Sequence, residues 1–584
     1  MNLINVADVT KAYGPKPLLH GVSLGVDAGD RIGVVGRNGD GKTTLVSILA
    51  KRVPPDDGRV THARDLRIAL LTQRDEFPGR GSVRDVVLGE RHEHEWAGDA
   101  RIRDIFTGLL GDVDLDAAVG ELSGGERRRV ALARLLVPES DVVVLDEPTN
   151  HLDIEAIDWL ARRLRERAAA LIVVTHDRWF LDEVTDRTWE VVDGGVERYE
   201  GGYSAYTLAK AQRDRIAAAA EDKRQNLLRK ELAWLRRGPR ARTSKPRFRV
   251  DAAQALIADV PPLRDEVELT RFATARLGKT VYDLEDVTVA AGDQTIFERM
   301  TWRLGPGDRV GVLGRNGSGK TTLLRLLTGA IAPISGRVTR GKTVQPAHLS
   351  QELTELDPAR RVLESVEEIK RRITVGKRDW TAGQLLERLG FRGDAQWTPV
   401  ADLSGGERRR LQLLRLLMGE PNVLLLDEPT NDLDIETLTE LEDLLDGWPG
   451  TLVVVSHDRY FLERVTDHVV ALLGDGRISM LPGGVDEYLS RRETAKNADR
   501  TGRNAAPARS NDAARGWRAR KELDRLERRI DKLTARAAEL HAELAAHATD
   551  YERLLELNGE LQSIEAERAQ AEDEWLQLAA DLDA

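Results

Sequence analysis

Two glycine-rich stretches carry the residue types that bind phosphate groups. Residues 36–43 read Gly-Arg-Asn-Gly-Asp-Gly-Lys-Thr, and residues 314–321 read Gly-Arg-Asn-Gly-Ser-Gly-Lys-Thr. Each stretch matches the pattern G-x-x-x-x-G-K-[ST], in which backbone amides cradle phosphates, the lysine reaches the β- and γ-phosphate oxygens and the threonine ligates magnesium. Each also lies between a predicted strand and a predicted helix, as a phosphate loop requires. We therefore predict two nucleotide-binding loops, formed by Gly36, Asn38, Gly39, Gly41, Lys42, Thr43 and Thr44 and by Gly314, Asn316, Gly317, Ser318, Gly319, Lys320, Thr321 and Thr322.

A pair of carboxylates follows an apolar run in each half of the chain. The run Val142–Leu145 leads to Asp146 and Glu147, and an equivalent run leads to Asp427 and Glu428. Four apolar residues in succession predict a buried strand that delivers both carboxylates at its C-terminal end. We expect the aspartates to help hold Mg²⁺ and the glutamates to act as general bases on an attacking water.

Three further patterns recur in both halves. Leu-Ser-Gly-Gly-Glu precedes a helical run, and its serine and glycines predict a helix N-terminus that an anion can approach closely. A glutamine and a histidine each stand at the end of another apolar run, and we assign the glutamines to the nucleotide and magnesium sites. The residues concerned are Ser123, Gly124, Gly125, Gln73 and His176 in the first half and Ser404, Gly405, Gly406, Gln351 and His457 in the second.

These patterns occur twice in the same order. Ser123 and Asp146 recur 281 residues later (404 − 123 and 427 − 146), and Lys42 recurs 278 residues later (320 − 42). An internal repeat of this kind indicates one domain present in two copies. We therefore predict an α/β protein with two phosphate-loop ATPase domains in tandem, at 1–205 and 279–490.

The composition excludes several classes of protein. The chain has 584 residues and no cysteine, so disulfides and thiolate metal sites are excluded. The N-terminal Met-Asn-Leu-Ile-Asn lacks the pattern of a secretory signal, and no apolar run reaches about 18 residues. We therefore expect a cytoplasmic protein without a membrane domain. Because 98 acidic residues outnumber 87 basic ones, any nucleic-acid contact has to come from a local patch.

The segment 206–262 joins the two domains and concentrates basic residues. Between Lys223 and Arg249 it has 11 basic residues and one acidic residue, Glu231. Gly238-Pro239 interrupts its helical pattern. One interpretation is a solvated basic helical hairpin, and the other is a linker whose tip contacts the RNA backbone. The residues that we assign to RNA contact are Arg236, Arg237, Arg240, Arg242, Lys245 and Arg247.

The C-terminal region has a different pattern. Residues 491–520 are polar and indicate a flexible linker. From 521 onward leucines and other apolar residues recur three and four positions apart, with a break of register near 547–550. Two helices with one break predict an antiparallel coiled-coil hairpin over 521–584, and a dimerisation zipper is the alternative.

Together these residues and their order resemble the ATP-binding-cassette ATPases, in which Leu-Ser-Gly-Gly-Glu is the signature. The runs Glu-Pro-Thr-Asn-His-Leu-Asp and His-Asp-Arg-Trp-Phe-Leu-Asp, in two fused cassettes, are similar to the F class of that family. The resemblance implies cytoplasmic ATPases that use ATP and Mg²⁺ and act on the ribosome, with a linker that enters the tRNA exit site and touches tRNA and ribosomal RNA. The tail is similar to the C-terminal domain of Uup-type members of this class, which is associated with nucleic-acid binding.

The resemblance also implies how the two cassettes work together. They would close head to tail over two ATP molecules, so that the loop of Lys42 faces Ser404 and the loop of Lys320 faces Ser123. His176 and its counterpart would contact the γ-phosphate. ATP would close the clamp and set the linker for ribosome binding, and hydrolysis would open it. We expect a monomer whose partner is the ribosome, in general translation, ribosome assembly, relief of stalling or antibiotic protection.

Two positions depart from the pattern of the family. Tyr13 stands where an aromatic ring stacks on adenine, but its counterpart is Ala291, so the second site lacks that ring unless Tyr282 or Phe297 replaces it. Asp40 places an acid inside the first anion-binding loop. We expect the site with Tyr13 to bind ATP more tightly.

Two other functions stay open from the sequence. A transporter ATPase subunit would need a membrane partner and would not explain the basic linker. A DNA-binding ATPase that acts on branched DNA or in repair would use the C-terminal region, whose segment 515–536 is basic while 550–584 is acidic.

Overall fold

The computed structural model describes most of residues 1–213 and 277–504. The described ranges are 1–14, 17–73, 77, 81–89, 96, 98–213, 277–292, 294–350, 356–375, 378–388, 390–431 and 433–504. The chain forms two compact units, Met1–Arg492 and Glu493–Ala584. The six basic linker residues, Gln351 and the hairpin predicted over 521–584 lie outside the described residues. Below, residues 1–213 are the first half and residues 277–492 are the second half.

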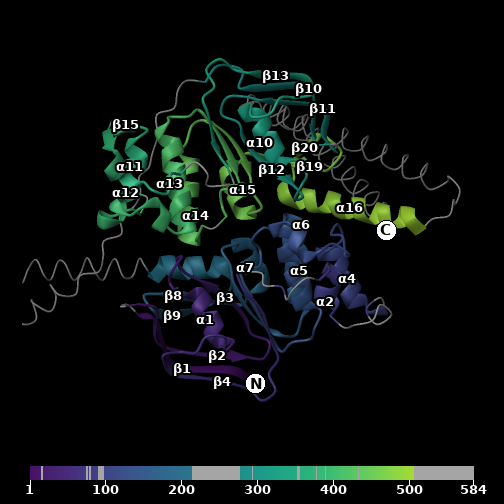
Figure 1. Cartoon of the computed structure of the whole chain (residues 1–584), viewed down its shortest axis with the longest axis vertical. Helices are drawn as coiled ribbons and strands as arrows, with labels where there is room; N and C mark the ends of the chain where they lie inside the picture. Colours follow the sequence, from purple (N-terminus) through teal and green to yellow (C-terminus); the bar gives the residue numbers. More distant parts are fainter. Residues whose placement is uncertain are drawn as a thin grey trace, which may run out of the picture. The chain divides into compact units, whose positions relative to one another are not determined.

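The first half is built around a six-stranded sheet with the order β5-β6-β7-β3-β8-β9, parallel except for its last strand. A separate antiparallel sheet has the order β2-β1-β4 (Figure 1). The elements are β1 (Asn2–Ala12), β2 (Pro17–Asp27), β3 (Arg31–Val35), α1 (Lys42–Leu49), β4 (Asp57–His62), β5 (Ile68–Leu71), α2 (Val83–Leu88), α4 (Ala100–Leu109), α5 (Gly124–Leu136), β6 (Val142–Asp146), α6 (Ile154–Glu166), β7 (Ala170–Val174), α7 (Arg178–Val184), β8 (Arg187–Val192) and β9 (Gly195–Glu200).

The second half repeats this topology with the sheet β14-β17-β18-β12-β19-β20 and the antiparallel sheet β11-β10-β13. It adds the antiparallel pair of β15 and β16. The elements are β10 (Tyr282–Ala291), β11 (Gln294–Leu304), β12 (Arg309–Gly314), α10 (Lys320–Thr328), β13 (Ser335–Arg340), β14 (Pro346–Leu349), α11 (Val362–Glu367), β15 (Arg372–Val375), β16 (Arg378–Thr381), α12 (Ala382–Arg388), α13 (Gly405–Met418), β17 (Val423–Asp427), α14 (Ile435–Asp446), β18 (Thr451–Val455), α15 (Arg459–Val465), β19 (His468–Leu472), β20 (Ile478–Leu481) and α16 (Gly484–Asn504).

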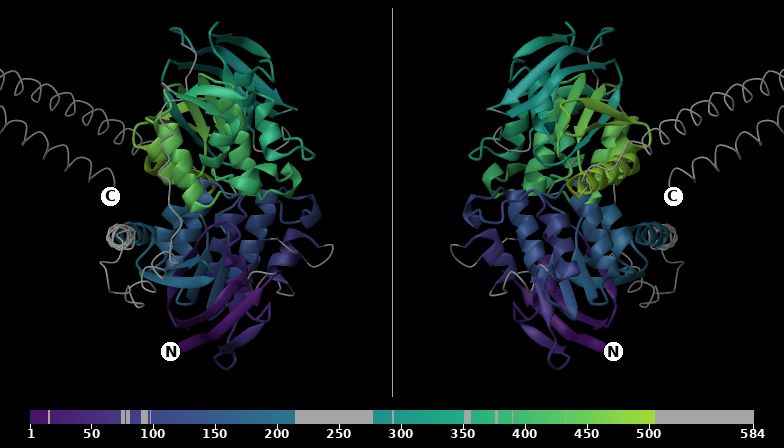
Figure 2. Two further views of the ribbon diagram at one scale, coloured as in Figure 1. Left: turned by 90° about the vertical axis from the view of Figure 1, so that its left-hand side faces the viewer. Right: turned by 90° about the vertical axis from the view of Figure 1, so that its right-hand side faces the viewer.

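The sequences of the central strands are continuous apolar runs because helices and the antiparallel sheet cover these strands. All five residues of β6, β7, β17 and β18 are buried, as parallel strands with both faces covered require. Figure 2 shows the antiparallel sheet of the first half, in purple, at one end of that half. The predicted α/β fold with two repeated phosphate-loop domains is confirmed.

The first strand, β1, spans 11 residues because it pairs with β2 on one side and with β4 on the other. Residues 491–504, which we expected to belong to a flexible linker, are helical and form the end of α16. In the described residues, no helix is both long and apolar enough to cross a bilayer.

Candidate nucleotide sites

The phosphate loops follow the carboxyl ends of β3 and β12, and each enters its helix at a glycine. Gly41 and Gly319 precede α1 and α10 with φ angles of 101° and 100°, a left-handed conformation that favours glycine. Lys42 Nζ donates to two carbonyl oxygens of its own loop, at 2.8 and 2.9 Å. Lys320 Nζ makes the same two contacts at 2.7 and 3.2 Å. Burial lowers the pKa of both lysines, so an anionic ligand would stabilise their charged form.

The aspartates that end β6 and β17 lie beside the threonines of the loops. Thr43 hydrogen-bonds the side chain of Asp146, and Thr321 does so with Asp427. One oxygen of each aspartate, Asp146 Oδ1 and Asp427 Oδ2, is buried without a hydrogen-bond partner. A buried carboxylate oxygen beside a threonine hydroxyl fits Mg²⁺, which binds one or two carboxylates together with phosphate oxygens. The part of the chain that the structure describes has no cluster of three or more acidic, histidine or cysteine side chains that could hold a metal.

The glutamates after these aspartates have a backbone conformation that is uncommon outside glycine. Glu147 has a φ of 50° and Glu428 a φ of 46°. Each donates its backbone N–H to the end of the neighbouring strand, at 2.8 and 2.9 Å, respectively. Both halves make this backbone contact, which holds the side chain of each glutamate at the edge of the sheet in its own half.

Each of these glutamates faces a histidine from the next strand end. His176 Nε2 lies 3.4 Å from Glu147 Oε1, and His457 Nε2 lies 3.2 Å from Glu428 Oε1. Burial raises the pKa of both glutamates to about 8 and lowers the pKa of His176 to about 3. The pKa of His457 also falls well below its usual value because the ring is buried. Both pairs therefore combine a neutral imidazole with a carboxyl group of high proton affinity.

Two arginines that the sequence reasoning did not single out hold these strand ends in place. Arg128 Nη2 donates to the carbonyl oxygen of Glu147 at 2.7 Å, and Arg409 Nη2 donates to that of Glu428 at 3.0 Å. Each is the second of three successive arginines, so residue type alone does not distinguish it. The available signal was helical periodicity, because Arg128 shares the buried face of α5 with Leu132.

The signature serines begin α5 and α13. Ser123 Oγ accepts a hydrogen bond from the backbone N–H of Glu126 at 3.4 Å and contacts its carboxylate at 2.7 Å. Ser404 forms the same capping box with Glu407. In this structure the hydroxyls thus stabilise their own helix starts. Gly125 is tightly placed, because a Cβ there would lie 2.9 Å from the carbonyl oxygen of His151.

A cavity brings the signature of the first half to the phosphate loop of the second. It is lined by Ser123, Gly124, Gly125 and His151 on one side and by Lys320, Thr321, Glu428 and His457 on the other. Asn316 Nδ2 donates to the carbonyl oxygen of His151 at 3.0 Å. The Asn316 N–H donates to Asp153 Oδ2 at 3.4 Å, and Arg315 Nη2 lies 3.1 Å from Asp112 Oδ2.

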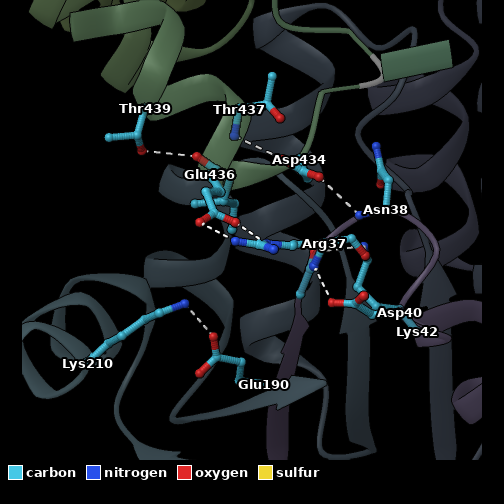
Figure 3. Close-up of polar contacts among 12 residues, drawn as sticks. Arg37, Asn38, Asp40, Lys42, Glu190, Lys210, Asp434, Glu436, Thr437 and Thr439 are labelled. Carbon is cyan, nitrogen blue, oxygen red and sulfur yellow. Dashed lines mark hydrogen bonds and ion pairs between the residues drawn. The ribbon is translucent and has the colours of Figure 1, made fainter. Parts of the chain in front are cut away.

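The first phosphate loop meets the second half in a similar way (Figure 3). The Asn38 N–H donates to Asp434 Oδ2 at 3.0 Å, and Arg37 pairs with Glu436, with Nη2 2.7 Å from Oε1. Asp434 is the N-cap of α14, just as Asp153 is the N-cap of α6. Each loop is therefore contacted by the start of a helix from the other half. These N-cap aspartates were not among the predicted site residues.

The two loops differ at one position. Asp40 Oδ2 accepts a hydrogen bond from the backbone N–H of Arg37 at 3.0 Å (Figure 3), and burial raises the pKa of Asp40. Its equivalent, Ser318, has a buried hydroxyl without a hydrogen-bond partner. One amide of the first loop is thus occupied by the loop's own side chain.

The aromatic residues considered for adenine stacking differ in exposure. The side chain of Tyr13 is 64% exposed, and Lys11 Nζ lies over its ring, 5.5 Å from the ring centre. Tyr282 and Phe297 are each 1% exposed and belong to the core of the second half, so neither ring has a face exposed for stacking. Gln73 is exposed just after β5.

A repeated phosphate loop, an Asp-Glu pair, a switch histidine position and a signature helix facing the other half define a tandem ATP-binding-cassette ATPase. A family model described as "ABC transporter" matches residues 19–150 and 297–431. A second model with that description matches 189–266, and one described as "ABC transporter C-terminal domain" matches 516–580.

Several named proteins are similar along most of the chain. The chain is 35% identical to "Uncharacterized ABC transporter ATP-binding protein YfmR" of Bacillus subtilis and 31% identical to "ATP-binding protein Uup" of Escherichia coli, with 99% of both chains covered in each comparison. It is 36% identical to "Energy-dependent translational throttle protein EttA" of Mycobacterium tuberculosis, over 80% of this chain and 90% of that one. The solved structure "RNase-L Inhibitor" has the same fold, with a TM-score of 0.58 and 21% identity over 83% of this chain and 92% of that one.

The chain belongs to the ABC-F family and resembles its Uup-type members. It is an ATPase, and its two halves are the first and second ATP-binding cassettes.

Proposed function

We propose that this ATPase couples the closing of its two cassettes over ATP to binding of the ribosome through the basic linker. The observation that carries the proposal is that each phosphate loop contacts the helix start of the other cassette, at Asp434 and at Asp153. Nucleotide binding and cassette closure would then be a single event. The relative EttA is named a translational throttle protein, and the segment 223–249 has the charge to contact RNA phosphates.

Within each site we propose one role for each group. Lys42 and Lys320 would bind the β- and γ-phosphates, with the loop amides and the signature glycines of the other cassette. Mg²⁺ would neutralise charge on the phosphates, and the residues that would hold it are Thr43, Gln73 and Asp146 in the first site and Thr321, Gln351 and Asp427 in the second.

The glutamates and histidines would act on the water and the γ-phosphate. Glu147 and Glu428 would orient the attacking water and accept its proton, which their raised pKa favours. His176 and His457, held neutral by burial, would contact the γ-phosphate. We further propose that the protein is a cytoplasmic monomer and that ribosomal RNA and tRNA are the ligands of the linker.

Sedimentation through a cushion with bacterial ribosomes tests the function. We expect the protein to pellet with ribosomes in a non-hydrolysable ATP analogue and to remain in the supernatant in ADP. Equal pelleting in both nucleotides would contradict coupling to ATP. A mobility shift of branched DNA without ribosome binding would favour the second candidate, a DNA-binding ATPase, for which the match of 516–580 to the C-terminal domain model is the relevant observation.

A further inference from the structure

Two equivalent glutamates have different partners where the two cassettes meet. Glu155 and Glu436 stand at equivalent positions, two residues after the N-cap aspartates of α6 and α14. Glu436 pairs with Arg37 of the opposite phosphate loop (Figure 3). Glu155 instead accepts hydrogen bonds from the Tyr488 hydroxyl at 3.0 Å and from Arg492 Nε at 2.7 Å, both on α16 of the second cassette.

In the corresponding helix of the first cassette, the equivalent tyrosine and basic residue pair with a carboxylate of their own cassette. Residues 203–213 are helical and follow β9 as α16 follows β20. There the Tyr206 hydroxyl donates to Glu190 Oε1 at 2.9 Å, and Lys210 also pairs with Glu190 (Figure 3). This carboxylate comes from β8 of the same cassette.

The two sheets differ at the position of Glu190. Glu190 pairs in register with Val35 of β3, and Ala471 pairs in register with Leu313 of β12, so the two positions are equivalent. Since Ala471 has no carboxylate, the hydroxyl and guanidinium of α16 find their acceptor in the first cassette. Arg315, the equivalent of Arg37, pairs with Asp112 instead.

The contact to α16 is also far more buried than its counterpart. The side chain of Glu155 is 8% exposed and that of Arg492 is 17% exposed, whereas those of Arg37 and Glu436 are 64% and 48% exposed. Water and salt screen the exposed pair, but a buried pair that loses one partner leaves an uncompensated charge. The Glu155 contact is therefore the stronger constraint on cassette closure.

We propose that Glu155 is a positioning residue for the second ATP site and that α16 holds it in place. Glu155 lies in the first turn of α6, whose N-cap Asp153 accepts one hydrogen bond from its own helix, at 3.0 Å, and one from the second phosphate loop, at 3.4 Å. Fixing the first turn of α6 fixes Asp153 against that loop. Opening of the second site must in turn break the contact to α16, the helix by which the chain leaves the first compact unit.

Steady-state kinetics of variants with one hydrolysing site test this inference, which rests on the proposed roles of Glu147 and Glu428. Glu147→Gln leaves the second site to hydrolyse ATP, and Glu428→Gln leaves the first. In the Glu147→Gln background, which reports on the second site, we expect Arg492→Met to raise KM for ATP about tenfold, the effect of losing a charge-assisted hydrogen bond. The kcat of this protein should change less than about twofold. In the Glu428→Gln background, which reports on the first site, KM should change less than about twofold.

Matched variants separate positioning from a loss of folding. Lys210→Met and Tyr206→Phe remove the equivalent groups of the first cassette and should leave KM of the second site unchanged. Arg492→Lys should recover part of the affinity, and Tyr488→Phe, which keeps the buried ring, should raise KM in the same direction. Glu155→Gln combined with Arg492→Met should be no worse than either change alone, because both remove one interaction.

Equal KM increases at both sites, or additive losses in the double variant, would overturn the inference. If Glu147→Gln alone abolishes turnover, ATP titration of the Glu147→Gln/Glu428→Gln protein replaces the kinetics. Arg492→Met should then weaken one of the two binding steps about tenfold, and two unchanged steps would overturn the inference. Failure of ribosome binding would instead remove the proposed function and leave this inference standing.

Discussion

The two glutamates at the ends of β6 and β17 combine a left-handed backbone conformation with burial, and a raised pKa accompanies both. Such conformations cost energy and persist where the surroundings impose them. Here the imposed geometry turns the carboxylate of Glu147 or Glu428 toward a histidine, at 3.4 and 3.2 Å. The same geometry in both cassettes favours one chemical role for both residues.

Replacing both glutamates by glutamine tests that role. Removing a general base costs roughly 10²–10⁴ in rate, while the amide keeps the size of the side chain. We therefore expect Glu147→Gln with Glu428→Gln to retain ATP binding, to lose turnover by that factor and to stay closed on ribosomes. Phosphate release and equilibrium ATP titration measure the two quantities. Turnover near that of the parent would remove both residues from the base role.

We propose that the exposed ring of Tyr13 makes the two ATP sites differ in affinity. An aromatic stack contributes about 0.5–1.5 kcal/mol, or roughly 3–10-fold in affinity. The first site should thus bind ATP more tightly than the second, where Tyr282 and Phe297 are buried. Tyr13→Ala should bring the two affinities together, and Tyr13→Phe should keep them apart. Two equal affinities in the parent protein, measured by calorimetric titration, would contradict the assignment.

At the scale of elements, helices α7 and α15 each place a buried arginine between the cassettes. Arg178 of α7 pairs with Glu442 and, at 3.3 Å, with Asp458 of the second cassette. Arg459 of α15 pairs with Asp158 of the first cassette at 2.9 Å and stacks on Trp179 with 3.5 Å to the ring centre. Each cassette thus contributes one arginine that pairs with a carboxylate of the other cassette, next to the switch histidines.

Arg178→Met should open the interface because it leaves Glu442, 1% exposed, with the more exposed Arg464, at 3.7 Å, as its remaining ion-pair partner. Loss of one partner of a buried pair costs about 3–5 kcal/mol, and separation of the cassettes would relieve that cost. We expect a larger radius of gyration in small-angle scattering of the nucleotide-free protein. Arg37→Met is the matched control, because its exposed pair contributes only about 0–1 kcal/mol. Identical scattering from Arg178→Met and the parent would contradict this account.

The elements show what the sequence could and could not predict. Apolar runs and the glycine-rich loops predicted the strand before each phosphate loop, the helix after it and the buried strand β6, because these signals are local. The partners of Glu155 and Glu436 could not be predicted, since both residues have the same local sequence position and differ only through distant side chains. The N-cap aspartates were likewise visible as helix starts but not as contacts to a loop in the other cassette.

At the scale of the whole molecule, the exit helices of the two cassettes are fixed differently. The helix 203–213 is tied to Glu190 of its own cassette and leads toward the basic linker. Helix α16 is tied to Glu155 of the other cassette and leads toward the C-terminal region. Closure of the second site therefore involves contacts of α16, whereas Tyr206 and Lys210 of the helix 203–213 stay paired within the first cassette.

Substitutions in the basic linker can separate ribosome binding from ATP hydrolysis. If the six residues from Arg236 to Arg247 contact RNA phosphates, affinity for ribosomes should fall by about 10³ between 50 and 200 mM salt, because each neutralised phosphate releases counterions. Changing all six to alanine should flatten this salt dependence and abolish ribosome binding. ATPase activity without ribosomes should survive, since the proposed catalytic residues lie outside 206–262.

Deletion of 515–584 provides the comparison for the linker variant. It removes the predicted hairpin and leaves the linker, both cassettes and the Glu155 contact to α16 in place. We expect this protein to retain most of its ribosome binding and its salt dependence, measured by sedimentation at several salt concentrations. Because the linker variant and the deletion change separate segments, their effects should be independent. Binding lost on deletion but kept in the linker variant would reverse the assignment and make the C-terminal region the nucleic-acid contact.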